Sequence, residues 1–310
     1  MKNFLGSDVL SAADFGREDI DHILETAEKL LPVALKEKTS NLLAGKLMAA
    51  LFYEPSTRTR LSFETAMNRL GGRVISAVGM EHSSLSKGET LYDTAKVVEN
   101  YADVIVVRHP GTGSAAELAE SASVPVINAG DGAGEHPTQA LLDLLTIKKM
   151  HGQIDGLTVA MVGDLKYGRT VHSLSQMLSH YGAKLIFVSP DALKMPDSVK
   201  AVLSGRGVVF EEMEQLEPAL KQAQIVYSTR VQRERFADMA EYERFKHYYI
   251  LTRALIEKYN PKMTIMHPLP RVGEIAMDVD GLPGAAYFKQ VQNGVAVRMA
   301  LLALVLGADL

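Results

Sequence analysis

Hydroxyl and arginine side chains alternate in the segment Ser56-Thr57-Arg58-Thr59-Arg60, which lies between a predicted strand and a predicted helix. The first backbone N–H groups of a helix have no partner within the helix, and they carry partial positive charge. Hydroxyls and guanidinium groups beside them would complete a cradle for a phosphate group. Taken alone, the segment is equally compatible with a Ser or Thr helix cap followed by solvated arginines.

Two further segments place polar side chains where predicted strands end. Arg108-His109-Pro110 closes one strand, and His136-Pro137-Thr138-Gln139 follows the glycine-rich segment 129–134 and opens a helix. His136 and Gln139 are three residues apart, so both can project from one face of that helix. A surface arginine and a structural histidine are the alternative explanations. Open α/β sheets bind ligands beyond the carboxyl ends of their strands, which favours a functional role.

The second half of the chain repeats this arrangement with two more arginines. Arg169 follows Gly168 after one predicted strand, and Ser228-Thr229-Arg230-Val231-Gln232 ends another. A guanidinium group matches the geometry of a carboxylate, so two arginines at neighbouring strand ends would suit a dicarboxylate. His267-Pro268-Leu269-Pro270 ends the last predicted strand, and a proline-locked loop would present backbone carbonyls there, with X–Pro bonds of the kind that adopt cis forms.

The segment from Gly163 to Thr170 also nearly matches G-x-x-x-x-G-K-[ST], the phosphate loop of nucleotide hydrolases. Arg169 stands where that motif has its lysine. We find no downstream apolar strand that ends in an aspartate able to hold Mg²⁺. A nucleotide hydrolase is therefore the weaker alternative, and an ordinary strand–turn–helix connection explains the segment as well.

Alternating strand and helix patterns must position these segments. Apolar residues at three- and four-residue spacing predict helices at about 17–36, 57–71, 90–101, 114–121, 138–150, 169–181 and 293–306. Short apolar runs predict strands at about 46–53, 73–78, 102–108, 124–128, 157–162, 184–188, 208–210, 225–227 and 263–267. This alternation predicts an α/β fold with mainly parallel sheets flanked by helices.

Composition narrows the class of protein. The chain has 310 residues, a length that suggests about two domains. Its net charge of -4 argues against a protein that grips nucleic acid through phosphates. The absence of cysteine excludes disulfides, thiolate catalysis and Cys-type zinc sites. No apolar run is long enough to span a bilayer and no secretory signal is evident, so we expect no membrane partner and a cytoplasmic protein.

Together these segments resemble the carbamoyltransferase family. Ser56-Thr-Arg-Thr-Arg60 and His136-Pro-Thr-Gln139 are similar to its carbamoyl-phosphate signatures. The aspartate branch is matched by Lys87-Gly-Glu89, Gly168-Arg-Thr170, Thr229-Arg-Val-Gln232 and His267-Pro-Leu-Pro270. The ornithine branch typically carries cysteine in the last motif, whereas this chain has Pro268 there. The resemblance covers essentially the whole chain, and a transferase that uses ornithine or another amino acid is the alternative within the family.

The resemblance implies transfer of the carbamoyl group of carbamoyl phosphate to the amino group of L-aspartate, an early step of pyrimidine biosynthesis, with no cofactor and no metal. Ser56, Thr57, Arg58 and Thr59 would hold the phosphate. Thr59, Arg108 and His136 would polarise the carbamoyl carbonyl. Gln139 and the backbone carbonyls of Leu269 and Pro270 would orient the carbamoyl and amino groups. Arg169 would bind the α-carboxylate of aspartate and Arg230 its β-carboxylate, with Gln232 steering Arg230.

The polar loop Ser83-Ser84-Leu-Ser-Lys87-Gly-Glu89 reads by itself as a surface turn. In the family, this loop reaches into the site of a neighbouring subunit within a trimer. The resemblance therefore implies a homotrimer in which Lys87 contributes to catalysis and aspartate binding. Loop length leaves two candidates for the serine that accompanies it, Ser83 and Ser84. A separate regulatory chain is a further possible partner.

The resemblance also divides the chain. We expect residues 1–137 together with 288–310 to form a carbamoyl-phosphate-binding domain, and residues 151–287 to form an aspartate-binding domain. Residues 138–150 would be the helix that connects them. Each domain would be a mainly parallel sheet flanked by helices, with the active site in the crevice between them.

Overall fold

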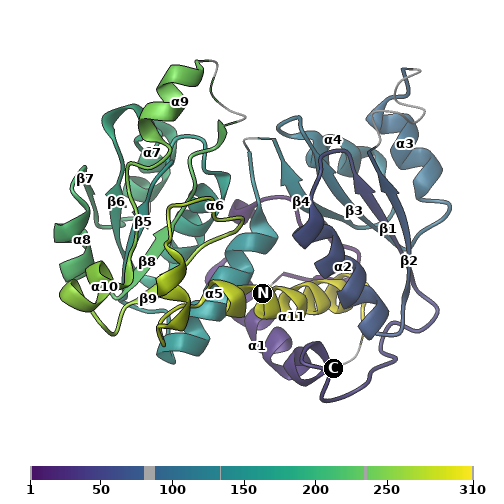
Figure 1. Ribbon diagram of the computed structural model, residues 1–310. Helices are drawn as coiled ribbons and strands as arrows, with labels where there is room; N and C mark the ends of the chain where they lie inside the picture. The colour runs from purple at the N-terminus through teal and green to yellow at the C-terminus, as the bar shows by residue number, and fades with distance from the viewer. Residues whose placement is uncertain (1, 80–87, 133, 234–235, 237, 309–310) are drawn as a thin grey trace. The chain divides into compact units, whose positions relative to one another are not determined.

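The computed structural model describes residues 2–79, 88–132, 134–233, 236 and 238–308, and the chain divides into two compact units (Figure 1). The first unit comprises Met1–Leu145 and Val291–Leu310, and the second comprises Thr146–Gln290. The divisions fall inside the helices α5 (Pro137–His151) and α11 (Tyr287–Val305), so each of these helices contributes to both units.

The first unit is built on a four-stranded sheet in the order β2-β1-β3-β4. All its strand pairs are parallel, which requires a crossover between successive strands. The strands are β1 (Leu47–Phe52), β2 (Arg73–Val78), β3 (Val104–His109) and β4 (Val126–Asp131). The crossovers and the N-terminal helix are α1 (Arg17–Ala34), α2 (Thr57–Arg69), α3 (Leu91–Val98) and α4 (Ser114–Ser121).

One face of this sheet is covered by α3 and α4. Ala95 and Leu118 of these helices pack in one buried cluster with Leu51, Ile105 and Val107 of the strands. The alternate strand residues point to the opposite face and are also fully buried, as expected for a sheet covered on both sides. In Figure 1, α2 and α11 lie on that side, and a hydrogen bond between Ser62 and Arg298 joins them directly.

The second unit is built on a five-stranded parallel sheet in the order β7-β6-β5-β8-β9. Its strands are β5 (Thr158–Val162), β6 (Lys184–Val188), β7 (Phe210–Met213), β8 (Ile225–Ser228) and β9 (Thr264–Met266). Its helices are α6 (Arg169–Leu178), α7 (Asp197–Gly205), α8 (Leu216–Gln222), α9 (Met239–Phe245) and α10 (Arg253–Tyr259). Short 3₁₀ helices lie at Ala12–Asp14, Ser179–Tyr181, Asp191–Leu193 and Met277–Gly281.

The expected α/β class with parallel sheets flanked by helices is confirmed in both units. Three details differ from the sequence expectations. The last helix begins at Tyr287, six residues before the expected start, because its first turns carry buried polar side chains that hide the apolar pattern. The strand expected at 208–210 forms at Phe210–Met213, where a half-exposed edge strand lacks a clear apolar run. The short helices α7 to α10 were not predicted, because seven to nine residues carry little periodicity.

Candidate active site

Three neighbouring strands of the first unit bring the first group of expected site residues to one sheet edge. The carboxyl ends of β1, β3 and β4 are adjacent, because the strands pair in parallel in that order. Ser56 caps α2 in an extended conformation directly after β1. Arg108 is the second-last residue of strand β3, and His136 lies between β4 and α5. The sequence motifs therefore converge at the edge that commonly binds ligands in such sheets.

Burial separates these residues into two kinds. Thr59, His136 and Gln139 are buried, with 8%, 5% and 9% of their surface exposed. Thr57 and Arg58, in the first turn of α2, are exposed. A hydroxyl, an imidazole and an amide are thus fixed by packing, while a guanidinium is accessible at the positively polarised start of the helix. This combination can receive an anion and hold a neutral polar group beside it.

Arg108 is anchored at both ends of its guanidinium group. Its Nη1 donates to the Ala129 carbonyl at 3.2 Å, and its Nη2 lies 3.2 Å from Glu54 Oε2. The register of β3 and β4 shifts between Val107 and His109, which locally alters the pairing next to this arginine. A bound anion would therefore have to share Arg108 with the Glu54 carboxylate or displace it.

The loop before His136 is held by the carboxylate of Asp131. Its Oδ1 accepts the Glu135 N–H at 2.7 Å, and its Oδ2 accepts the Gly113 N–H at 2.9 Å. Gly132 has a φ of 51°, and a Cβ there would lie 2.4 Å from the Pro110 carbonyl oxygen. The glycine-rich sequence is thus required by close backbone packing, and it fixes where α5 begins.

In the second unit, Asp164 organises the turn between β5 and α6. Its carboxylate accepts the backbone N–H groups of Tyr167 at 3.0 Å and Gln232 at 3.4 Å. Burial raises the pKa of Asp164 to about 6, although these hydrogen bonds act to lower it. A phosphate loop would leave such N–H groups for a nucleotide, whereas here a carboxylate takes them. The hydrogen bond from the Tyr167 N–H, which belongs to this segment, therefore argues against the phosphate-loop interpretation.

The two expected aspartate-binding arginines flank this turn. Arg169 is the first residue of α6, and Arg230 follows β8, the neighbour of β5. Thr229 Oγ1 donates to the carbonyls of Val162 and Asp164 at 3.2 and 3.3 Å. Gln232 Nε2 donates to the Tyr167 carbonyl at 3.0 Å. Gln232 thereby links the Arg230 segment to the turn that carries Arg169.

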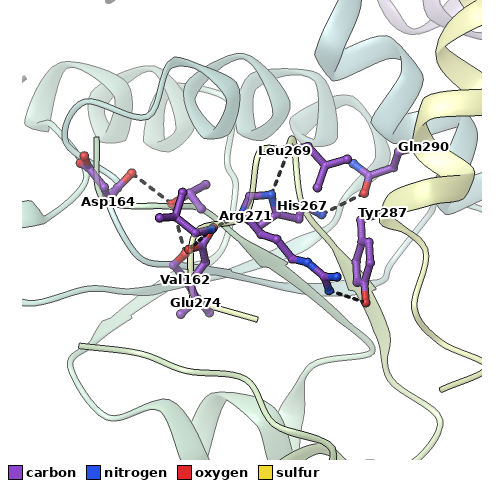
Figure 2. Close-up of polar contacts among 10 residues, drawn as sticks. Val162, Asp164, His267, Leu269, Arg271, Glu274, Tyr287 and Gln290 are labelled. Atoms are coloured by element: carbon purple, nitrogen blue, oxygen red, sulfur yellow. Dashed lines mark hydrogen bonds and ion pairs between the residues drawn. The ribbon is translucent and has the colours of Figure 1, made fainter. Parts of the chain in front are cut away.

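The loop after β9 is fixed by a buried histidine–carboxylate pair (Figure 2). His267 Nε2 lies 2.5 Å from Glu274 Oε1, and the Leu269 N–H donates to His267 Nδ1 at 2.7 Å. Nδ1 must accept, so the imidazole is neutral with its proton on Nε2. Burial lowers the pKa of His267, in agreement with this state. Gln290 Oε1 accepts the His267 N–H at 2.9 Å, and the Leu269–Pro270 bond is cis.

Several organising residues carried no signal in the sequence motifs. Asp164 and Glu274 shape the loops of the second unit, and Asp143 and Arg298 are buried in helices of the first. Arg298 and Asp143 could have been noticed as charged residues within otherwise apolar helical stretches. By contrast, Ser83, Ser84 and Lys87 lie outside the described residues, so their expected role is not addressed by this structure. Within the described part of the chain, no group of three or more metal-ligating side chains occurs.

The fold and the strand-end residues define a two-unit α/β protein with hydroxyl and arginine side chains at the strand ends of one sheet and two arginines at the strand ends of the other. Comparison with known proteins makes this class specific. The description "Aspartate/ornithine carbamoyltransferase, carbamoyl-P binding domain" matches residues 7–149, and "Aspartate/ornithine carbamoyltransferase, Asp/Orn binding domain" matches residues 155–305. The chain therefore belongs to the aspartate/ornithine carbamoyltransferase family.

Individual relatives are similar over nearly their whole length. The aspartate carbamoyltransferase catalytic subunit of Methanothrix thermoacetophila is 55% identical over 298 residues, which is 96% of this chain and 97% of that one. The solved catalytic subunit of M. jannaschii aspartate transcarbamoylase is 49% identical with a TM-score of 0.89, covering 96% and 97% of the two chains. Aspartate transcarbamoylase of Trypanosoma cruzi, solved with N-(phosphonacetyl)-L-aspartic acid, is 40% identical with a TM-score of 0.92, covering 99% and 98%.

Proposed function

We propose that this chain transfers the carbamoyl group of carbamoyl phosphate to the amino group of L-aspartate, giving N-carbamoyl-L-aspartate and phosphate. Two groups of residues at the strand ends support this proposal most directly. The group in the first unit suits an anion that carries a neutral polar group, and the group in the second unit contains two arginines that suit two carboxylates. Family membership and full-length similarity to aspartate carbamoyltransferases support the same reaction.

The residues of the first unit would bind and activate carbamoyl phosphate. Ser56, Thr57 and Arg58 hold the phosphate at the start of α2, and Arg58 offsets the charge that grows on the leaving oxygens. Thr59, Arg108 and His136 donate to the carbamoyl oxygen, on which negative charge develops in the tetrahedral intermediate. The backbone carbonyls of Leu269 and Pro270, together with Gln139, orient the carbamoyl and amino groups.

The residues of the second unit would select the acceptor. Arg169 binds the α-carboxylate and Arg230 the β-carboxylate, with Gln232 fixing the segment that carries Arg230. A cationic acceptor such as ornithine would be repelled by Arg230. Most of the rate gain would come from positioning and electrostatics, because the reaction needs no covalent enzyme intermediate. The amine must lose a proton, and His136 and the departing phosphate are both candidate acceptors.

The assembly belongs to the proposal as well. We expect a homotrimer in which Lys87, with Ser83 or Ser84, completes the site of the neighbouring chain. The relatives are named catalytic subunits, so a separate regulatory chain is a further proposed partner. We also propose a cytoplasmic location. Among the described helices, none combines the length and apolar character needed to cross a membrane.

A comparison of acceptors tests the proposed function. The purified chain is incubated with carbamoyl phosphate and either L-aspartate or L-ornithine, and the ureido product is measured colourimetrically. We expect product with aspartate alone, and in the Arg230→Ala variant we expect a loss of aspartate use without a change in carbamoyl-phosphate binding. Product with ornithine and not with aspartate would refute the assignment of the acceptor.

A further inference from the structure

A buried arginine lies in the apolar C-terminal helix α11. Arg298 on α11 is 4% exposed, and its Nη1 donates to Ser62 Oγ on α2 at 2.8 Å. Its guanidinium carbon lies 5.1 Å from the centre of the Phe63 ring. A buried cation is costly unless a nearby charge compensates it. Burial lowers the pKa of Arg298 to about 10, and the attraction of the Asp143 carboxylate opposes this shift.

Asp143 connects this arginine to a residue of the proposed site. Asp143 is fully buried on α5, and its Oδ1 accepts a hydrogen bond from Gln139 Nε2 at 2.9 Å. Gln139 is one helical turn before Asp143, so the two side chains share a face of α5. Hydrogen bonds therefore join Arg298 to Ser62 and Asp143 to Gln139, and electrostatic attraction couples the two charged side chains, across three helices of the first unit.

The charge of Asp143 determines which end of the Gln139 amide faces it. An ionised carboxylate can only accept hydrogen bonds, so the NH₂ group of Gln139 must point toward Asp143. The amide oxygen Oε1 is then the atom left to meet a ligand. Without a compensating cation, a buried carboxyl group favours its protonated form, which can donate. A donating Asp143 would allow the Gln139 amide to turn over and present NH₂ instead.

The space around Arg298 is closely fitted. Gly294 lies one turn earlier on α11, and a Cβ at this position would be 2.8 Å from Arg298 Nη1 and 3.0 Å from Leu142 Cδ2. Any larger residue at position 294 would have to push the guanidinium away from its present contacts. The glycine thus preserves the place of the arginine rather than a special backbone conformation, since its φ is not positive.

We propose that Arg298 and Asp143 are a positioning pair that holds Gln139 with its Oε1 toward the NH₂ group of carbamoyl phosphate. The inference rests on the proposed function and adds to it a specificity rule. The site accepts a carbonyl carbon that carries a hydrogen-bond donor, as the carbamoyl group does, and it is less complementary to acyl phosphates whose carbonyl carries a methyl group.

The ligand N-(phosphonacetyl)-L-aspartic acid separates this role from general stability. It has a methylene group between phosphorus and the carbonyl carbon, and it has no NH₂ group corresponding to the carbamoyl nitrogen. Its binding should therefore depend much less on the orientation of Gln139 than the reaction of carbamoyl phosphate does, since only its amide N–H, which corresponds to the aspartate amino group, could meet this side chain. Loss of folding or of the phosphate cradle, by contrast, would weaken this ligand and carbamoyl phosphate alike.

The test measures kcat with carbamoyl phosphate and aspartate, and the inhibition constant of N-(phosphonacetyl)-L-aspartic acid, in Arg298→Met, Arg298→Lys and Gln139→Ala chains. We expect Arg298→Met to lower kcat by about 10²-fold, as for a misplaced orienting group, with partial recovery in Arg298→Lys. The inhibition constant should change by no more than about twofold, and the Arg298→Met/Gln139→Ala chain should be no slower than Gln139→Ala alone.

Three results would each overturn the positioning role. The first is an unchanged kcat in a folded Arg298→Met variant, and the second is a kcat in the double variant that falls by the product of the two single losses. The third is an inhibition constant that rises as steeply as kcat falls. If Arg298→Met does not fold, Gly294→Ala displaces the guanidinium without removing it, and Gly205→Ala, where nothing lies within 4 Å, is the matched control. If the unmodified chain forms no N-carbamoyl-L-aspartate, the proposed function itself is contradicted. If the unmodified chain is active and the Arg298→Met variant is equally active, only the positioning role is contradicted.

Discussion

At the scale of single residues, positively charged side chains gather locally in a chain whose net charge is negative. Its net charge is -4, yet Arg58 and Arg108 lie at one sheet edge and Arg169 and Arg230 at another. Glu54 and the Ala129 carbonyl hold Arg108, and Arg58 is exposed at the start of α2. These local clusters of arginines, which the total charge conceals, would bind the small anionic substrates of the proposed function.

Substitutions of Arg58 and of Arg60, two residues further along α2, should have very different effects on kcat. Arg58→Ala should lower kcat by about 10²- to 10³-fold, because it removes a donor to the developing charge on the leaving group. Arg60 is the matched control, since its Nε lies 3.9 Å from Glu64 along the surface of the same helix. Steady-state kinetics should show Arg60→Ala within about twofold of the parent, because such surface pairs contribute little. Equal losses in both variants would contradict the assigned role of Arg58.

The buried pair of His267 and Glu274 predicts a loss of stability in mild acid. Burial lowers the pKa of His267 below its ordinary value of 6.5, so the folded chain binds fewer protons than the unfolded chain as the pH falls through 6.5, and stability falls. Burial acts to raise the pKa of Glu274, but the hydrogen bonds from His267 and Val272 outweigh it and lower this pKa from 4.5. The stabilisation from Glu274 is therefore present above pH 4.5 and is lost as the pH falls through the lowered value.

Urea unfolding at pH 7.5, 6 and 5 measures this dependence in the parent chain and in His267→Asn. We expect the parent to lose more stability than the variant between pH 7.5 and 5, even though the variant is less stable at pH 7.5 by about 1–3 kcal/mol through its lost hydrogen bonds. The other histidines are the same in both chains, so the difference reports the pair of His267 and Glu274. Parallel pH profiles would show that His267 is not held neutral by the fold.

At the scale of elements, parallel pairing places the carboxyl ends of neighbouring strands side by side, so the residues that follow these strands lie close together. The sequence predicted correctly the strand that contains Arg108 and the strand that precedes His136, since buried parallel strands read as apolar runs. It did not predict the short helices α7 to α10, and it placed the edge strand β7 too early in the chain, because tertiary packing rather than periodicity decides the structure there. It also missed Asp143 and Arg298, whose contact partners are distant in the sequence or visible only after the helices pack.

The junction of β5 and β8 requires a glycine at position 163. Gly163 has a φ of 117°, and a Cβ there would lie 2.3 Å from the Thr229 carbonyl oxygen, directly before Arg230. Gly163→Ala should destabilise the chain by about 3 kcal/mol and raise the KM for aspartate, because backbone strain and overpacking add. Gly156 has a φ of 69° and open space around it. Gly156→Ala should therefore lower the free energy of unfolding by about 1 kcal/mol and leave the KM for aspartate unchanged. Thermal unfolding and kinetics of both variants check this, and equal effects would contradict it.

At the scale of the whole molecule, the proposed function assigns one substrate to each of the two units. The proposed homotrimer adds a third contribution, Lys87 from a neighbouring chain. The native mass should then be about three times 33.8 kDa, or a multiple of that value if regulatory chains bind. The sequence suggests the trimer through the resemblance alone, because symmetry between copies leaves no local signal in one chain.

Subunit exchange tests the shared site. Arg58→Ala and Lys87→Gln chains should each be nearly inactive, and a mixture that has exchanged subunits should regain part of the activity, because some sites then combine two unmodified contributions. Exchange is verified by native mass spectrometry of chains of different mass. Mixed trimers without recovered activity would exclude a role for Lys87 in the neighbouring site.

The central claim is a metal-independent transfer to aspartate, and ³¹P NMR of carbamoyl phosphate in the presence of EDTA tests it most directly. We predict that the enzyme converts carbamoyl phosphate to inorganic phosphate rapidly only when L-aspartate is present, with one N-carbamoyl-L-aspartate formed for each phosphate. Enzyme-dependent phosphate release without aspartate, a requirement for a metal ion, or phosphate without the matching ureido product would contradict the account.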